Sequence, residues 1–154
     1  MPIKSFRGLI AHDSVETVHL HTQNGSTGYR IVDLDIMYHT PGVGDLDAVV
    51  QVFSIPQTAA SATVDFSNQT LLGAAFIRQD ADNSNITGRM AGHILFDNVV
   101  FNQDIFITLK NATPPAGGTA STAPCNFLIK LEQVKLDLNE NTVATLKDIR
   151  NIEQ

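Results

Sequence analysis

Two histidines separated by one residue are the first candidates for chemistry in this sequence. In an extended strand, His19 and His21 would lie on the same face, about 7 Å apart. Two imidazoles at that spacing chelate zinc, iron or copper if a third ligand completes the site. Cupin β-barrels add a glutamate within a few residues, whereas residues 22–25 contain none. We therefore expect an exposed strand face that carries polar rings, no bound metal and no cofactor.

His12, Asp13 and Ser14 have the residue types of a hydrolase triad. Adjacent residues of a strand point to opposite faces, so these three side chains cannot converge. The sequence also lacks the Gly-x-Ser-x-Gly elbow that presents a nucleophilic serine. We expect no catalytic residue and no enzymatic activity.

Two further features favour structural interpretations. Residues 80–85 place oxygen-bearing side chains at alternate positions, but they lack the glycine and the closing glutamate of a calcium-binding loop. Cys125 is the only cysteine, so no intrachain disulfide can form, and it opens an apolar segment without basic neighbours. We expect a solvated acidic loop and a buried, unreactive thiol.

The composition excludes several function classes. The chain has 154 residues, of which 43% are hydrophobic and 17% charged, and a formal net charge of −6. Its ten basic residues are scattered, whereas phosphate binding requires them to cluster. The start lacks the apolar core of a signal peptide, and no apolar stretch is long enough to span a membrane. We expect synthesis in a reducing cytoplasm, with no binding to nucleic acid or membrane.

A period of two residues predicts the strands that must position these side chains. In residues 29–38, Val32, Leu34, Ile36 and Tyr38 share one face, opposite Asp33 and Asp35. Other predicted strands cover residues 3–10, 14–21, 48–55, 62–66, 70–78, 89–96 and 104–110.

The last predicted strand changes phase along its length. Its apolar residues are odd-numbered from Phe127 to Leu131 and even-numbered from Val134 to Leu138. One extra residue reverses the facing of a strand, so this pattern predicts a β-bulge near residues 132–133. A strand that crosses from one sheet to the other would have the same pattern.

The period changes in residues 139–154, where capping residues precede Val143, Leu146, Ile149 and Ile152. This spacing predicts a short C-terminal helix with a narrow apolar stripe. A spacing of three drifts around a helix by about 60° per step, so one flat sheet cannot cover the whole stripe. These four residues are therefore interface candidates for docking in a groove, and we expect that groove on a neighbouring subunit.

Eight or nine short strands at intervals of about a dozen residues favour an all-β fold. We predict a single antiparallel β-sandwich that is jelly-roll-like and carries the short C-terminal helix. Residues 1–138 would form the sandwich domain. Residues 139–154 would form a helical tail, which belongs to the same domain or docks on a neighbour.

Several segments resemble small virion structural proteins of marine tailed bacteriophages. These segments are residues 12–17, 22–30, 64–72, 96–107 and 131–150, together about half of the chain. None of them is a catalytic motif. The resemblance implies a component of a virus particle, either a capsid decoration or cement protein or an accessory part of the tail.

Two classes of function then compete. A non-enzymatic decoration protein would be made in the host cytoplasm and built into the virion. It would bind the major capsid protein or other virion proteins and self-associate, with a trimer favoured. The alternative is a β-sandwich of the tail or a fibre that binds a receptor or carbohydrate. Carbohydrate sites stack sugars on exposed aromatic rings, and the absence of tryptophan with only two tyrosines favours assembly.

Overall fold

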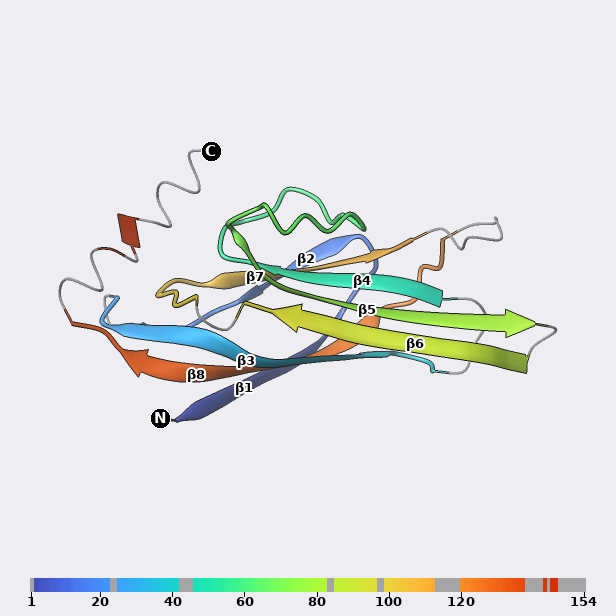
Figure 1. Cartoon of the computed structure of the whole chain (residues 1–154), viewed down its shortest axis with the longest axis horizontal. Coiled ribbons are helices and arrows are strands. Elements are labelled where there is room, and N and C mark those ends of the chain that lie inside the picture. Colours follow the sequence, from blue (N-terminus) through green and yellow to red (C-terminus); the bar gives the residue numbers. More distant parts are fainter. Residues whose placement is uncertain are drawn as a thin grey trace.

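The computed structural model describes residues 2–22, 25–41, 46–82, 85–96, 99–112, 120–137, 143, 145 and 146. Within these residues the chain forms two antiparallel sheets packed as a sandwich (Figure 1). The predicted all-β sandwich is confirmed at this level. The strands are β1 (Ile3–Ile10), β2 (Ser14–Val18), β3 (Thr27–Tyr38), β4 (Leu46–Phe53), β5 (Leu71–Asp82), β6 (Asn85–Leu95), β7 (Ile105–Asn111) and β8 (Cys125–Lys135).

The two sheets have different sizes. The three-stranded sheet has the order β1-β8-β3, and the five-stranded sheet has the order β2-β7-β4-β5-β6. The pairs β1–β8, β2–β7 and β4–β5 are nested around the connection between β4 and β5. Only two residues separate β5 from β6, a connection length typical of a hairpin. This short connection accounts for the pairing of β6 with β5.

The predicted C-terminal helix lies almost entirely outside the described residues. Val143, Thr145 and Leu146 have helical backbone conformation, but no helix is defined in the part of the chain that the structure describes. No described helix is long and apolar enough to cross a membrane.

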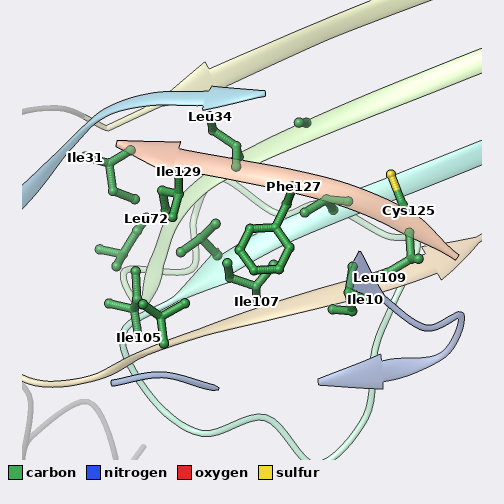
Figure 2. Packing of buried hydrophobic residues seen from close by; sticks show 14 of the residues in the cluster. Ile10, Ile31, Leu34, Leu72, Ile105, Ile107, Leu109, Cys125, Phe127 and Ile129 are labelled. Atoms are coloured by element: carbon green, nitrogen blue, oxygen red, sulfur yellow. The ribbon is translucent and has the colours of Figure 1, made fainter. Parts of the chain in front are cut away.

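The core lies between the sheets and is formed by alternate residues of each strand. In β8, the inward residues Cys125, Phe127, Ile129 and Leu131 are all buried. Figure 2 shows Phe127 and Ile129 facing Ile107 of the opposite sheet. Each buried side chain of this size contributes roughly 1.5–3 kcal/mol relative to exposure, before the cost of ordering the chain.

Both tyrosines belong to this core. The Tyr38 hydroxyl in β3 donates a hydrogen bond of 3.0 Å to the Ile77 carbonyl in β5, which ties one sheet to the other. The Tyr29 hydroxyl donates to the His21 carbonyl at 2.7 Å. Burial raises the pKa of Tyr38, because an ionised phenolate would lose solvation there.

Strand β3 changes its buried face halfway along its length. Tyr29 and Ile31 are buried, and the next buried residue is Leu34. The pairing of β3 with β8 shifts register between Ile31 and Asp33. Val32 is therefore the extra residue of a β-bulge, and it points outward with 39% of its surface exposed. The prediction that Val32 shares a face with Leu34 is wrong.

The bulge predicted in the last strand is also wrong. The extra residue that reverses the facing of a strand lies in the paired strand β3. Residues Leu131, Glu132 and Gln133 of β8 pair in unbroken register with β3. The strand ends at Lys135, and buried Leu136 lies beyond it. The phase change therefore reflects the end of β8.

Two other predicted strands differ from the structure. Residues 62–66 form no strand, because the Ser61 and Thr63 carbonyls accept hydrogen bonds from the Gln51 side chain and not from a sheet ladder. Strand β2 ends at Val18. Beyond it, the backbone N–H of Leu20 donates to a carboxylate oxygen of Asp104 at 2.8 Å.

The bulge predicts that substitutions at two neighbouring residues lower the free energy of unfolding by very different amounts. Ile31→Ala should lower the free energy of unfolding by about 2–5 kcal/mol, because it leaves a cavity in the core. Val32→Ala should change the free energy of unfolding by less than about 1 kcal/mol, because Val32 faces outward. Urea denaturation measures both. Equal losses would contradict the assigned bulge.

Candidate functional site

The histidine pair does not form the strand face that the sequence predicts. His19 and His21 follow β2 and are exposed. The His19 Nδ1 atom lies 3.1 Å from an Asp104 carboxylate oxygen, and 82% of the His19 side chain is exposed. Among the described residues, no group of three or more histidine, cysteine or acidic side chains could hold a metal ion. Asp104, which directly precedes β7, thus holds in place the segment that follows β2.

His12, Asp13 and Ser14 form the corner between β1 and β2, where the chain passes from one sheet to the other. Each side chain has a different partner. His12 Nδ1 accepts a hydrogen bond from the Asn111 N–H at 3.1 Å, and the Ser14 hydroxyl donates to the Ala11 carbonyl at 2.6 Å. Asp13 has a φ of 58° and forms an ion pair with Lys110 at 3.2 Å. The three side chains hold this corner and do not converge.

Cys125 is fully buried at the start of β8. Burial raises the pKa of its thiol to about 11, and a contact of 3.5 Å to the Met37 carbonyl only partly opposes this shift. The thiol is therefore neutral at physiological pH. The complete burial of Cys125 confirms its predicted buried location. The acidic loop predicted for residues 80–85 is wrong in its extent, because residues 80–82 belong to β5 and Asn85 belongs to β6. Asp80 lies 3.4 Å from Arg78 of the same strand.

The outer face of the five-stranded sheet carries an exposed cluster of apolar side chains, which we call the aromatic patch. Phe76 of β5 pairs with Gly92 of β6, and its ring lies so close that a Cβ atom on Gly92 would be 3.0 Å from it. Two residues of the 54–70 loop lie beside this pair and line a hollow of about 370 Å³. The aromatic patch consists of Val49, Val64, Phe66, Phe76, Met90 and Ile94.

Buried Gln51 holds the 54–70 loop over this face (Figure 1). Its Nε2 atom donates to the Ser61 carbonyl at 2.8 Å and to the Thr63 carbonyl at 3.1 Å. Phe66 of the loop packs edge-on against Phe96, with ring centroids 5.3 Å apart. A buried amide with two hydrogen bonds and an aromatic contact therefore fix the loop that contributes Val64 and Phe66 to the hollow.

The outer face of the three-stranded sheet is the second exposed surface, which we call the three-stranded face. Met37 is 62% exposed and Leu9 is 48% exposed. They surround a shallow hollow of about 670 Å³, which Arg7 and Asp35 also line. Neither face was identified from sequence, because an outward apolar residue becomes evident only when the facing of its strand is known.

The predicted tail interface is visible only in part. Val143 is 67% exposed and Leu146 is 59% exposed, whereas Ile149 and Ile152 lie outside the described residues. Between the first two, the Thr145 hydroxyl accepts a hydrogen bond of 3.1 Å from the Asn102 amide. This contact attaches the tail to its own domain, while two of its apolar side chains remain accessible.

Comparisons with protein-family models, with curated proteins and with solved structures give no match.

The buried thiol predicts a specific loss of stability in alkali. Because its pKa rises from 9 in the unfolded chain to about 11 in the fold, the unfolded chain loses this proton first. The free energy of unfolding should fall between these pH values, by about 2 kcal/mol from this group. Cys125→Ala should have the shallower fall, measured by urea denaturation at pH 8 to 11, because it removes the thiol and also the part of the Tyr38 pKa shift that Cys125 causes. Identical slopes would contradict a shifted thiol pKa.

Proposed function

We propose that this chain is a non-enzymatic virion structural protein, a capsid decoration or cement protein that stabilises a shell through protein contacts. The observation that carries the proposal is the exposure of apolar side chains on the outer faces of both sheets, above all in the aromatic patch. In a sandwich these faces are ordinarily polar. The resemblance of five segments to virion proteins supports the same function.

The aromatic patch fits a protein partner. Aromatic residues and methionine are enriched at protein interfaces, whereas charged residues are depleted at interface cores. Phe66, Phe76 and Met90 supply these residue types, and the anchored loop presents Phe66 without a large cost of ordering. We assign this patch to the major capsid protein or another virion protein, with no direct contact to nucleic acid or membrane.

The strand pairing supports the finer assignment of a jelly-roll-like fold. A jelly roll is an eight-stranded double sheet in which the chain is doubled back on itself. The nested pairs β1–β8, β2–β7 and β4–β5 have this pattern. Strand β6 departs from it, because it pairs with β5 and not with β3. Jelly rolls occur in viral capsid and lectin domains, so this assignment is compatible with both candidate functions.

A receptor- or carbohydrate-binding protein of the tail or a fibre is the second candidate. Two features of the hollow favour it. Phe66 and Phe76 supply exposed rings, and Asp47 and His93 supply polar groups beside them. Apolar walls with a few polar groups are typical of small-ligand sites. Both tyrosines, by contrast, are buried and unavailable for stacking on sugars.

Binding to particles that lack this protein tests the decoration function. The chain should co-sediment with such shells and raise their disruption temperature. Ile94→Asp should weaken binding at least about tenfold, because it places a charge in the aromatic patch. Ala11→Asp is the control, since Ala11 is exposed at the corner between β1 and β2 and lies outside both outer faces. Failure of the wild-type chain to bind would count against decoration, and specific glycan binding that Phe76→Ala abolishes would favour the alternative.

Deletion of residues 140–154 tests the tail as an interface. The truncated chain should keep its β-type circular dichroism and cooperative melting, because every residue of the described core lies outside this segment. Its association with shells or with other copies should weaken, because the exposed Val143 and Leu146 are removed. Unfolding of the truncated chain would place the tail in its own core. Normal assembly would show that the tail is dispensable.

A further inference from the structure

The three-stranded face has an ordered arrangement of side chains across its strands. In one cross-strand row, Leu128 of β8 lies between Arg7 of β1 and Asp35 of β3. In the next row, Asn126 lies between Leu9 and Met37. The central strand is thus flanked by opposite charges in the first row and by two exposed apolar side chains in the second.

The charges in this face differ in whether they are neutralised within the chain. Arg30 forms an ion pair with Glu132, and Lys130 lies 3.8 Å from Asp33. Arg7 and Asp35 form no ion pair within the described part of the chain, since two strand spacings, about 10 Å, separate their backbones. Both are exposed, so the face presents one positive and one negative group on opposite sides of Leu128.

We propose that the three-stranded face binds the same face of a second copy of this chain, about a twofold axis parallel to β8. Such a rotation keeps each row in place and exchanges the two edge strands. It puts Arg7 of each copy opposite Asp35 of the other, and Leu9 of each copy opposite Met37 of the other. Two ion pairs and two apolar contacts form, with Leu128 against its own counterpart on the axis.

The charge pattern selects this axis. A twofold axis in the same plane but perpendicular to the strands would put each edge strand opposite itself, so that Arg7 would face β1 of the partner copy. Only the axis along β8 pairs both free charges at once. Lys130 and Glu132 also lie on β8 and face their own counterparts, but their intrachain partners Asp33 and Arg30 offset that repulsion.

The dimensions of the face set the strength of the contact. Three strands spaced about 4.8 Å apart and eight rows long give a face of about 14 by 26 Å. This is smaller than the roughly 800 Å² per partner of a standard interface, so we expect a weak dimer that dissociates readily. A twofold contact predicts a dimer and not the trimer favoured from sequence. It concerns self-association alone and stands or falls independently of the virion assignment.

Charge-reversal variants test the pairing directly. Sedimentation equilibrium of the full chain should show a concentration-dependent dimer. Arg7→Glu alone sets two acidic groups against each other, and Asp35→Arg alone sets two basic groups against each other. Each variant should raise the dissociation constant of its own dimer at least about tenfold. An equimolar mixture of the two variants should dimerise again, because each reversed charge then faces an opposite one.

Matched controls keep the outcome unambiguous. Arg89→Glu makes the same charge change at an exposed residue of β6. Its dimer should have the same dissociation constant as the wild-type dimer at each salt concentration. Circular dichroism melting confirms that every variant is folded. The proposal is overturned if the wild-type chain stays monomeric at millimolar concentration, if it forms a trimer that neither variant weakens, or if the mixed variants fail to associate.

Discussion

Strand β8 lies between β1 and β3, and neither of these strands pairs with any other strand within the described residues. The three-stranded sheet therefore depends on the alternation in β8. Its odd-numbered residues from Cys125 to Leu131 are buried against the opposite sheet, while its even-numbered residues form the middle of the three-stranded face. One strand thus supplies both the centre of the core on one side of the sheet and the axis of the proposed dimer on the other.

Much of the fold was predictable because burial imposes a period of two on the sequence. Residues 3–10 were predicted as a strand with the same bounds as β1, and Cys125 was predicted to be buried. The bulge was assigned to the wrong strand, because apolar periodicity records the facing of one chain segment and not the register of its partner. In β3, Val32 is apolar and fits the alternation, so only the pairing with β8 reveals that it is the extra residue.

The candidate surfaces were less predictable than the core. Val64 and Phe66 have the composition of a strand, yet the hydrogen bonds from Gln51 of the preceding strand β4 hold their segment as a loop. Met37 and Arg7 are ordinary residues in their own strands, and their significance arises only when β8 brings β1 and β3 together. Tertiary pairing creates such surfaces, whereas His19 and His21 were conspicuous in sequence and have only a local role.

The late position of β8 in the chain has a consequence for biosynthesis. As the protein leaves the ribosome, β1 and β3 emerge long before the strand that joins them, so they wait unpaired while the hairpin of β4 and β5 can already form. Contacts between distant segments slow folding, and β1 pairs with β8. The three-stranded face therefore does not exist on a nascent or prematurely terminated chain. A chain that is truncated before β8 therefore cannot form the face through which we propose that two copies associate.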